Sequence, residues 1–233
     1  MSGAAWHALF DALAWASAAL AGWIATRLAP APFPLDRAMR RDWLLVVILG
    51  SAAGAYLFGT LNLWASGQAG LARSIEGAIF GGVLAVEAWK RANGVTARTG
   101  AALAAPLAAG VAVGRIGCFL AGLEDFTYGT PTALPWGHDF GDGVTRHPVQ
   151  LYESAAMAAF LLAYAALAPR SAFVRRNGFY LAVGFYGAQR FGWEFLKPYS
   201  GVAGPLTVFH LLSAALFFYA TVMIATDPQR ARR

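Results

Sequence analysis

The sequence predicts an all-α protein, a polytopic transmembrane bundle of about seven spans that forms a single integral-membrane domain over residues 1–233. The chain is 58% hydrophobic and only 13% charged, and its mean hydropathy is +0.50. Soluble domains contain about 25% charged residues, so most of this protein's surface is suited to lipid rather than to water. The length accommodates about seven helices of about 20 residues joined by short loops.

Seven apolar stretches divide the chain, and each is long enough to approach or cross a bilayer. They cover residues 5–28, 43–63, 74–89, 100–120, 150–168, 178–196 and 205–226. The first ten residues lack the basic segment of a secretory signal, so we expect the first stretch to remain as a span. Small residues around Gly81, Gly82 and Gly110 predict close helix packing. A polar segment at 121–149 separates the fourth stretch from the fifth.

The basic residues predict the orientation. Of the 18 lysines and arginines, thirteen lie in the first, third and fifth loops and the C-terminal tail, three lie on the opposite side, and two lie inside the stretches. Basic loops are retained in the cytoplasm, so we expect the N-terminus outside, the C-terminus in the cytoplasm and the 121–149 segment outside. The basic residues cluster at the ends of apolar stretches, which is typical of membrane orientation and does not favour nucleic-acid binding.

Charged residues recur at one predicted membrane depth. Arg115 lies near the end of the fourth stretch, and Arg190 and Glu194 lie one helical turn apart near the end of the sixth. Glu153 lies at the start of the fifth stretch, and His147 lies three residues before that stretch. Spans alternate in direction, so all five are expected near the outer face. A charge inside the membrane costs at least about 2.5–3.5 kcal/mol and usually faces a partner in the bundle interior.

Each of these residues, taken alone, fits a structural ion-pair network as well as a functional site. Two arginines together with carboxylates and a histidine favour an anion-binding site. The planar guanidinium binds phosphate or carboxylate in a bidentate manner and keeps its charge. The anion expected at the outer leaflet is a phospholipid headgroup phosphate.

Three motifs carry a family resemblance. They are GRIGCFLAG at 114–122, RHPVQLYE at 146–153 and YGAQRFGWEF at 186–195. In this order they resemble the prolipoprotein diacylglyceryl transferase family, over about residues 100–197. The resemblance implies a seven-span enzyme of the bacterial inner membrane that transfers the diacylglyceryl group of phosphatidylglycerol to a lipobox cysteine thiol. Glycerol phosphate would leave at the periplasmic face, where the site is expected.

The resemblance also implies roles for individual residues. The candidate catalytic residues are Arg115, His147, Glu153 and Arg190. The candidate substrate-binding residues are Glu124, Asp125, Gln150, Tyr152 and Glu194. The arginines are expected to hold the phosphate and Glu194 to orient Arg190, while the base stays open among His147, Glu153 and Asp125. We expect no metal and no cofactor.

The sequence departs from the family pattern at several places. Cys118 stands where the family has asparagine, Leu123 where it has glutamate, and Phe80 where a histidine is expected in the third stretch. Cys118 is expected to be a small packing residue. The chain also leaves no room for the family's large periplasmic head domain. The donor is therefore expected to be phosphatidylglycerol or a similar anionic phospholipid, whereas the acceptor stays open between a prolipoprotein, another protein and a small molecule. The alternative is a non-catalytic phospholipid-binding or lipid-translocating membrane protein.

Overall fold

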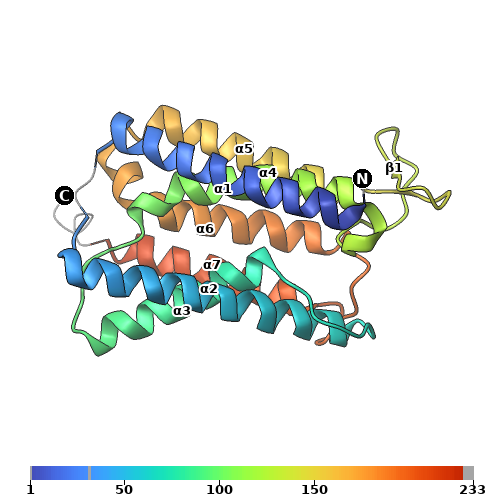
Figure 1. The fold of residues 1–233 in the computed structure, drawn as a ribbon, viewed down its shortest axis with the longest axis horizontal. Helices are drawn as coiled ribbons and strands as arrows, with labels where there is room; N and C mark the ends of the chain where they lie inside the picture. Colours follow the sequence, from blue (N-terminus) through green and yellow to red (C-terminus); the bar gives the residue numbers. More distant parts are fainter. Residues whose placement is uncertain (1, 31–32, 228–233) are drawn as a thin grey trace.

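The computed structural model describes residues 2–30 and 33–227 and is almost entirely helical. Seven α-helices in this part of the chain lie side by side along the long axis of the molecule (Figure 1). Their bounds are Gly3–Leu28 (α1), Arg37–Ala65 (α2), Ile75–Ala92 (α3), Ala104–Ala121 (α4), Val149–Leu167 (α5), Ala172–Glu194 (α6) and Val208–Ala225 (α7). Two short 3₁₀ helices, η1 (Ala101–Leu103) and η2 (Gly122–Asp125), flank α4. The predicted all-α class is confirmed.

Five helical segments are long and apolar enough to cross a membrane: α1, α2, the segment Ala101–Asp125 that contains α4, α5, and α7. Helices α3 and α6 do not meet this criterion, because charged side chains lower their hydropathy. Both helices place some of these charges in the bundle interior, where Glu76 of α3 and Arg190 of α6 are almost fully buried. The structure therefore supports a helical membrane bundle. The count of seven spans and the orientation of the termini remain predictions.

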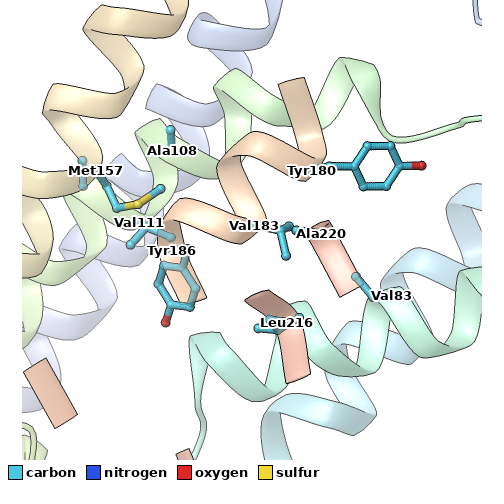
Figure 2. Close-up of a cluster of buried hydrophobic side chains, with 10 residues drawn as sticks. Val83, Ala108, Val111, Met157, Tyr180, Val183, Tyr186, Leu216 and Ala220 are labelled. Atoms are coloured by element: carbon cyan, nitrogen blue, oxygen red, sulfur yellow. The ribbon is translucent and has the colours of Figure 1, made fainter. Parts of the chain in front are cut away.

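Helix α6 is the central element of the bundle. Figure 1 shows α1, α4 and α5 on one side of it and α2, α3 and α7 on the other. Helix α1 packs along α4, α2 packs along α3, and α6 contacts α4, α5 and α7. An apolar core joins helices α3 to α7, and Figure 2 shows that its Tyr186 directs its hydroxyl away from Val111 and Met157. The core therefore ends at a polar group on α6.

Glycines bring α2 and α3 into backbone contact. A Cβ atom added at Gly54 would lie 2.3 Å from the carbonyl oxygen of Gly77, and one added at Gly81 would lie 2.5 Å from that of Gly50. Only glycine permits this approach. The close packing predicted at Gly81 is therefore present, whereas a Cβ at Gly110 would make ordinary contacts at 3.7 Å or more.

The segment between α4 and α5 closes one end of the bundle. It contains η2 and a small antiparallel hairpin of β1 (His138–Asp139) and β2 (Thr145–Arg146). In Figure 1 this hairpin projects at the end where α1 begins, and α7 ends at the opposite end. The Thr130 amide donates to the Leu196 carbonyl at 2.6 Å, which attaches the segment to the chain after α6. The predicted polar loop is thus a structured cover over the helix ends.

Candidate functional site

Six buried charged side chains form one network at the end of the bundle closed by the 121–149 segment. We call it the ion-pair cluster, and its members are Glu76 of α3, Arg115 of α4, Glu153 of α5, Arg190 and Glu194 of α6, and Lys197, which follows α6. Each residue is at most 5% exposed. With three cations and three carboxylates, the ionised cluster is neutral, and this neutrality makes the burial of six charges tolerable.

Glu153 lies at the centre of the ion-pair cluster. Its Oε2 lies 2.6 Å from Arg115 Nη2, and its Oε1 lies 3.1 Å from Arg190 Nη1 and 3.2 Å from Lys197 Nζ. Both carboxylate oxygens are thus engaged by cations from three different segments. This arrangement suits Glu153 to positioning the two arginines rather than to accepting a proton from a substrate.

Arg190 uses its three guanidinium nitrogens on three carboxylates. Nε faces Glu76 at 3.2 Å, Nη1 faces Glu153 at 3.1 Å, and Nη2 faces Glu194 at 2.7 Å. The guanidinium carbon lies 5.3 Å from the ring centroid of Phe209 in α7. A planar, delocalised cation with donors on three sides can satisfy this arrangement, and an ammonium group cannot. Glu194 thus forms an ion pair with Arg190, and its role of orienting Arg190 stays a prediction.

The sequence reasoning missed four members of this site. Glu76 and Lys197 belong to the ion-pair cluster, the Ser213 hydroxyl donates to Glu76, and the Thr207 hydroxyl donates to Glu194 at 2.7 Å. In the sequence, Glu76 resembles an ordinary acidic residue in the first turn of a helix. Lys197 likewise resembles a flanking basic residue at the end of a span. Their roles appear only in the folded bundle, where Glu76 faces Arg190 of α6 and Lys197 faces Glu153 of α5.

Several buried polar atoms beside the ion-pair cluster have no hydrogen-bond partner among the described residues. They are both amide atoms of Gln150 and of Gln189, the Tyr186 hydroxyl, the Trp193 indole nitrogen and Arg115 Nε. Gln150 and Tyr186 are 0% exposed. Buried polar groups in proteins are almost always hydrogen-bonded. A concentration of unpaired donors and acceptors next to two arginines is therefore suited to binding a polar, anionic group.

His147 and Tyr152 form an aromatic group beneath the hairpin. The His147 Nδ1 lies 3.4 Å from the Tyr152 hydroxyl, which also accepts a hydrogen bond from Trp136 at 2.9 Å. The Tyr152 ring packs on Trp193 of α6, with 5.3 Å between ring centroids. His147 thus contacts Tyr152, which packs on Trp193, one of the residues with an unpaired polar atom. None of the contacts that His147 makes with the described residues is with the ion-pair cluster.

The acidic pair of η2 is divided between two environments. Asp125 Oδ1 lies 2.6 Å from His7 Nε2 of α1, and the Thr127 hydroxyl donates to the other oxygen, Oδ2. Glu124 is exposed, and a Cβ added at Gly3 would collide with its carboxylate, so this side chain lies against the start of α1. Asp125 is thus paired with a titratable side chain of α1.

Phe80 occupies an apolar position on α3. Its ring packs edge-on against Phe58 of α2, with 5.3 Å between centroids. The residue that stands in place of the expected histidine thus packs with α2. Helix α3 contributes to the ion-pair cluster through Glu76, one turn nearer its start.

Comparisons with known proteins agree over almost the whole chain. The family model described as prolipoprotein diacylglyceryl transferase matches residues 4–226. A protein named phosphatidylglycerol–prolipoprotein diacylglyceryl transferase from Geobacter sulfurreducens is 32% identical over 199 residues, covering 79% of this chain and 75% of its own. Proteins of the same name from Nitrobacter hamburgensis (29% identical; 95% of this chain, 85% of theirs) and Methylocella silvestris (32%; 78% and 71%) are also similar.

The chain therefore belongs to the prolipoprotein diacylglyceryl transferase family and is a transferase. Its apolar helices and its family together indicate a multi-pass protein of the bacterial inner membrane. The match begins in α1, so the relationship extends well beyond the motif region of residues 100–197 that carries the resemblance in the sequence.

Proposed function

We propose that this member of the prolipoprotein diacylglyceryl transferase family moves the diacylglyceryl group of phosphatidylglycerol to the cysteine thiol of a prolipoprotein at the outer face of the inner membrane. The names of its relatives support this donor and this acceptor over the other acceptors considered from the sequence. Family membership also favours an enzyme over a non-catalytic lipid carrier. The orientation predicted from the basic loops supports the choice of membrane face.

The observation that carries the proposal is the pair of buried arginines held on either side of Glu153. Arg115 and Arg190 come from α4 and α6, and their guanidinium groups are fixed by the same carboxylate at 2.6 and 3.1 Å. Preorganised cations of this kind stabilise charge as it develops, without reorganising during the reaction. A phosphate placed against both arginines would be held by the guanidinium N–H groups that the carboxylates leave free.

The proposed reaction is a displacement at carbon. The acceptor thiol loses its proton, its sulfur forms a bond to the glyceryl carbon next to the phosphate, and the carbon–oxygen bond to the phosphate breaks. The electron pair of that bond leaves with glycerol phosphate, where Arg115 and Arg190 stabilise the added charge. Charge stabilisation of this kind commonly contributes about 10²–10³-fold to the rate for a single donor.

The unpaired polar groups support a headgroup with hydroxyls. The headgroup of phosphatidylglycerol offers two hydroxyls, each a donor and an acceptor, and Gln150 and Gln189 each offer an unpaired amide oxygen and nitrogen. Among the candidate bases, Glu153 is fully engaged by cations and Asp125 by His7 and Thr127. This leaves His147, beside Tyr152, as the base that the geometry favours.

A lateral path for a two-tailed lipid is consistent with the helix packing. Helices α1, α4 and α5 form one group and α2 and α3 another, and the main contacts that connect these groups pass through α6 and α7. The ion-pair cluster draws residues from both groups, Arg115 and Glu153 from the first and Glu76 from the second. A lipid that enters between the groups would reach the arginines once the two groups separate, because Arg115 and Arg190 are at most 5% exposed.

The test uses the purified protein in nanodiscs that contain phosphatidylglycerol labelled in its headgroup, together with a lipobox peptide. We expect release of labelled glycerol phosphate only when the peptide carries its cysteine, and a diacylglyceryl thioether on that peptide by mass spectrometry. Arg115→Ala and Arg190→Ala should abolish both signals. A matched control is Arg170→Ala, which changes an exposed arginine that follows α5 at the opposite end of the bundle. Bound lipid without peptide-dependent release in the unaltered protein would refute the proposal.

A further inference from the structure

Three potential metal ligands from separate segments converge beside the ion-pair cluster. His7 lies on α1, Cys118 on α4 and Asp125 in η2, and their ligand atoms all lie within 4.8 Å of one another. These three residues do not form a metal-binding sequence motif, because His7 lies more than one hundred residues before Cys118 and Asp125. We propose that His7, Cys118 and Asp125 form a binding site for a divalent thiophilic metal ion, of which Zn²⁺ is the best fit.

The donor set matches the chemistry of zinc. Zn²⁺ binds imidazole nitrogen, thiolate sulfur and carboxylate oxygen, and three protein ligands with one open position are common for this ion. Hard cations such as Mg²⁺ prefer sites made only of oxygen. Metal–ligand bonds to nitrogen, oxygen and sulfur are about 2.0–2.3 Å long. The distance between His7 Nε2 and Asp125 Oδ1, now 2.6 Å, would therefore have to increase by less than about 1 Å to admit the ion between them. Side-chain rotation supplies such a shift without moving the helices.

The surroundings also favour a metal–thiolate. One thiolate and one carboxylate offset the two positive charges of the ion, so the occupied site is neutral. Arg115 Nη1 lies 3.9 Å from the Cys118 sulfur, so a metal-bound thiolate would have a guanidinium donor beside it. The Thr127 hydroxyl donates to the far oxygen of Asp125 and so orients the carboxylate, a common second-shell arrangement in metal sites.

The site is reachable from the aqueous side of the bundle end. The side chain of His7 is 27% exposed and that of Asp125 is 13% exposed, whereas the ion-pair cluster behind them is almost completely buried. An ion can therefore enter past His7 without opening the bundle. The competing interpretation is a metal-free His7–Asp125 ion pair with Cys118 as a packing residue.

The experiment exploits the fact that Cys118 is the only cysteine in the chain. The full-length protein in detergent is stripped of metal with a chelator and then titrated with Co²⁺ as a spectroscopic probe. We expect one equivalent to give a sulfur-to-cobalt charge-transfer band and the intense visible bands of tetrahedral Co²⁺, with Zn²⁺ displacing both. The same Zn²⁺ addition should slow alkylation of the thiol at least about tenfold.

Substitutions separate a built site from chance binding. His7→Gln and Asp125→Asn should each weaken Zn²⁺ binding by at least about 100-fold, since even second-shell changes cost about 10–100-fold. Thr127→Val should fall within that second-shell range, and it leaves intact the Thr127 carbonyl that accepts from Lys197. His138→Gln is the matched control, because this histidine packs between Phe119 and Phe140 on the same end of the bundle.

Absence of the charge-transfer band in the unaltered protein would overturn the proposal, and this readout does not depend on whether reagents reach the thiol. Equal binding in His7→Gln, Asp125→Asn and His138→Gln would overturn it as well. Neither readout uses transferase activity, so a failure here is distinguishable from a failure of the proposed function.

Discussion

Arg115 on α4 and Glu153 on α5 form a 2.6 Å ion pair in which the carboxylate is 0% and the arginine 5% exposed. The pair joins two neighbouring helices at the end of the bundle where the 121–149 segment begins and ends. Removing one member of a buried pair leaves the other as an uncompensated charge, which commonly costs about 3–5 kcal/mol. The pair therefore links the stability of the bundle to the geometry of the candidate site.

Glu153→Gln should destabilise the protein strongly. Arg115, Arg190 and Lys197 would then face only two carboxylates, so we expect a loss of about 3–5 kcal/mol in the free energy of unfolding. The midpoint of thermal unfolding in detergent measures it. Asp11→Asn is the matched control, because its pair with Arg73 is about half exposed and should contribute about 0–1 kcal/mol.

A second substitution checks the cause of this loss. Lys197→Met in the Glu153→Gln background removes one cation and restores neutrality, so the double variant should be more stable than Glu153→Gln alone. If the two losses simply add, charge balance is not what makes Glu153 important, and the interpretation of the ion-pair cluster is wrong.

Arg190→Lys should lower the transferase rate by at least about 100-fold while the positive charge is kept. An ammonium group cannot serve Glu76, Glu153 and Glu194 at once and cannot hold a phosphate in bidentate fashion. Release of glycerol phosphate measures the rate, with Arg176→Lys at the opposite end of the bundle as the matched control. If Arg190→Lys keeps its activity within a few-fold of the unaltered protein, Arg190 supplies only its positive charge and the proposed bidentate contact with phosphate is wrong.

Gly81→Ala and Gly110→Ala should have opposite effects on stability. The added methyl at Gly81 meets the α2 backbone at 2.5 Å, and overpacking of this kind costs about 1–3 kcal/mol. The methyl at Gly110 has room, with its first neighbour at 3.7 Å, so the helix-favouring alanine should stabilise by about 0.5–1 kcal/mol. Thermal unfolding of the two variants compares them directly, and equal destabilisation would contradict the tight α2–α3 contact.

The hairpin of the 121–149 segment should become less stable, and its amides less protected from hydrogen exchange, as the pH falls. Hydrogen bonds from Arg146, at 2.6 and 2.7 Å, hold the pKa of Asp142 below its usual range. A lowered folded-state pKa gives stability that is fully present above the unfolded pKa of about 3.9 and is lost as the pH falls through the lower folded value. Hydrogen exchange of the hairpin amides, corrected for the intrinsic effect of pH, reports the change. Asp142→Asn should remove the pH dependence, and an unchanged acid response in that variant would assign it to another group.

The apolar stretches located the helices well because membrane burial and helix formation coincide over most of each span. The predicted stretch 150–168 matches α5 (Val149–Leu167), whereas α2 begins six residues before the stretch at 43–63. Its N-terminus is set by Asp36, whose carboxylate accepts from the Met39 amide at 2.9 Å. Hydropathy marks the part of a helix in lipid, but capping marks where the helix begins.

The candidate site was predictable only in part. Arg115, Arg190 and Glu194 stand out because a charge inside an apolar stretch needs a partner. Glu76, by contrast, lies in the first turn of a helix where acids are common, and His7 gave no indication that Asp125 lies against it. Such pairings depend on how helices rotate and pack against one another, which the pattern along one helix does not contain.

The order of the cluster along the chain has a consequence for biogenesis. Read from the N-terminus, its members alternate in sign: Glu76, Arg115, Glu153, Arg190, Glu194, Lys197. During synthesis the accumulated charge of the unfinished cluster therefore alternates between −1 and zero, although Glu76 meets its own partner, Arg190, only when α6 is made. An uncompensated charge in the membrane is costly, and this order keeps the unfinished cluster within one charge of neutrality at every stage of insertion.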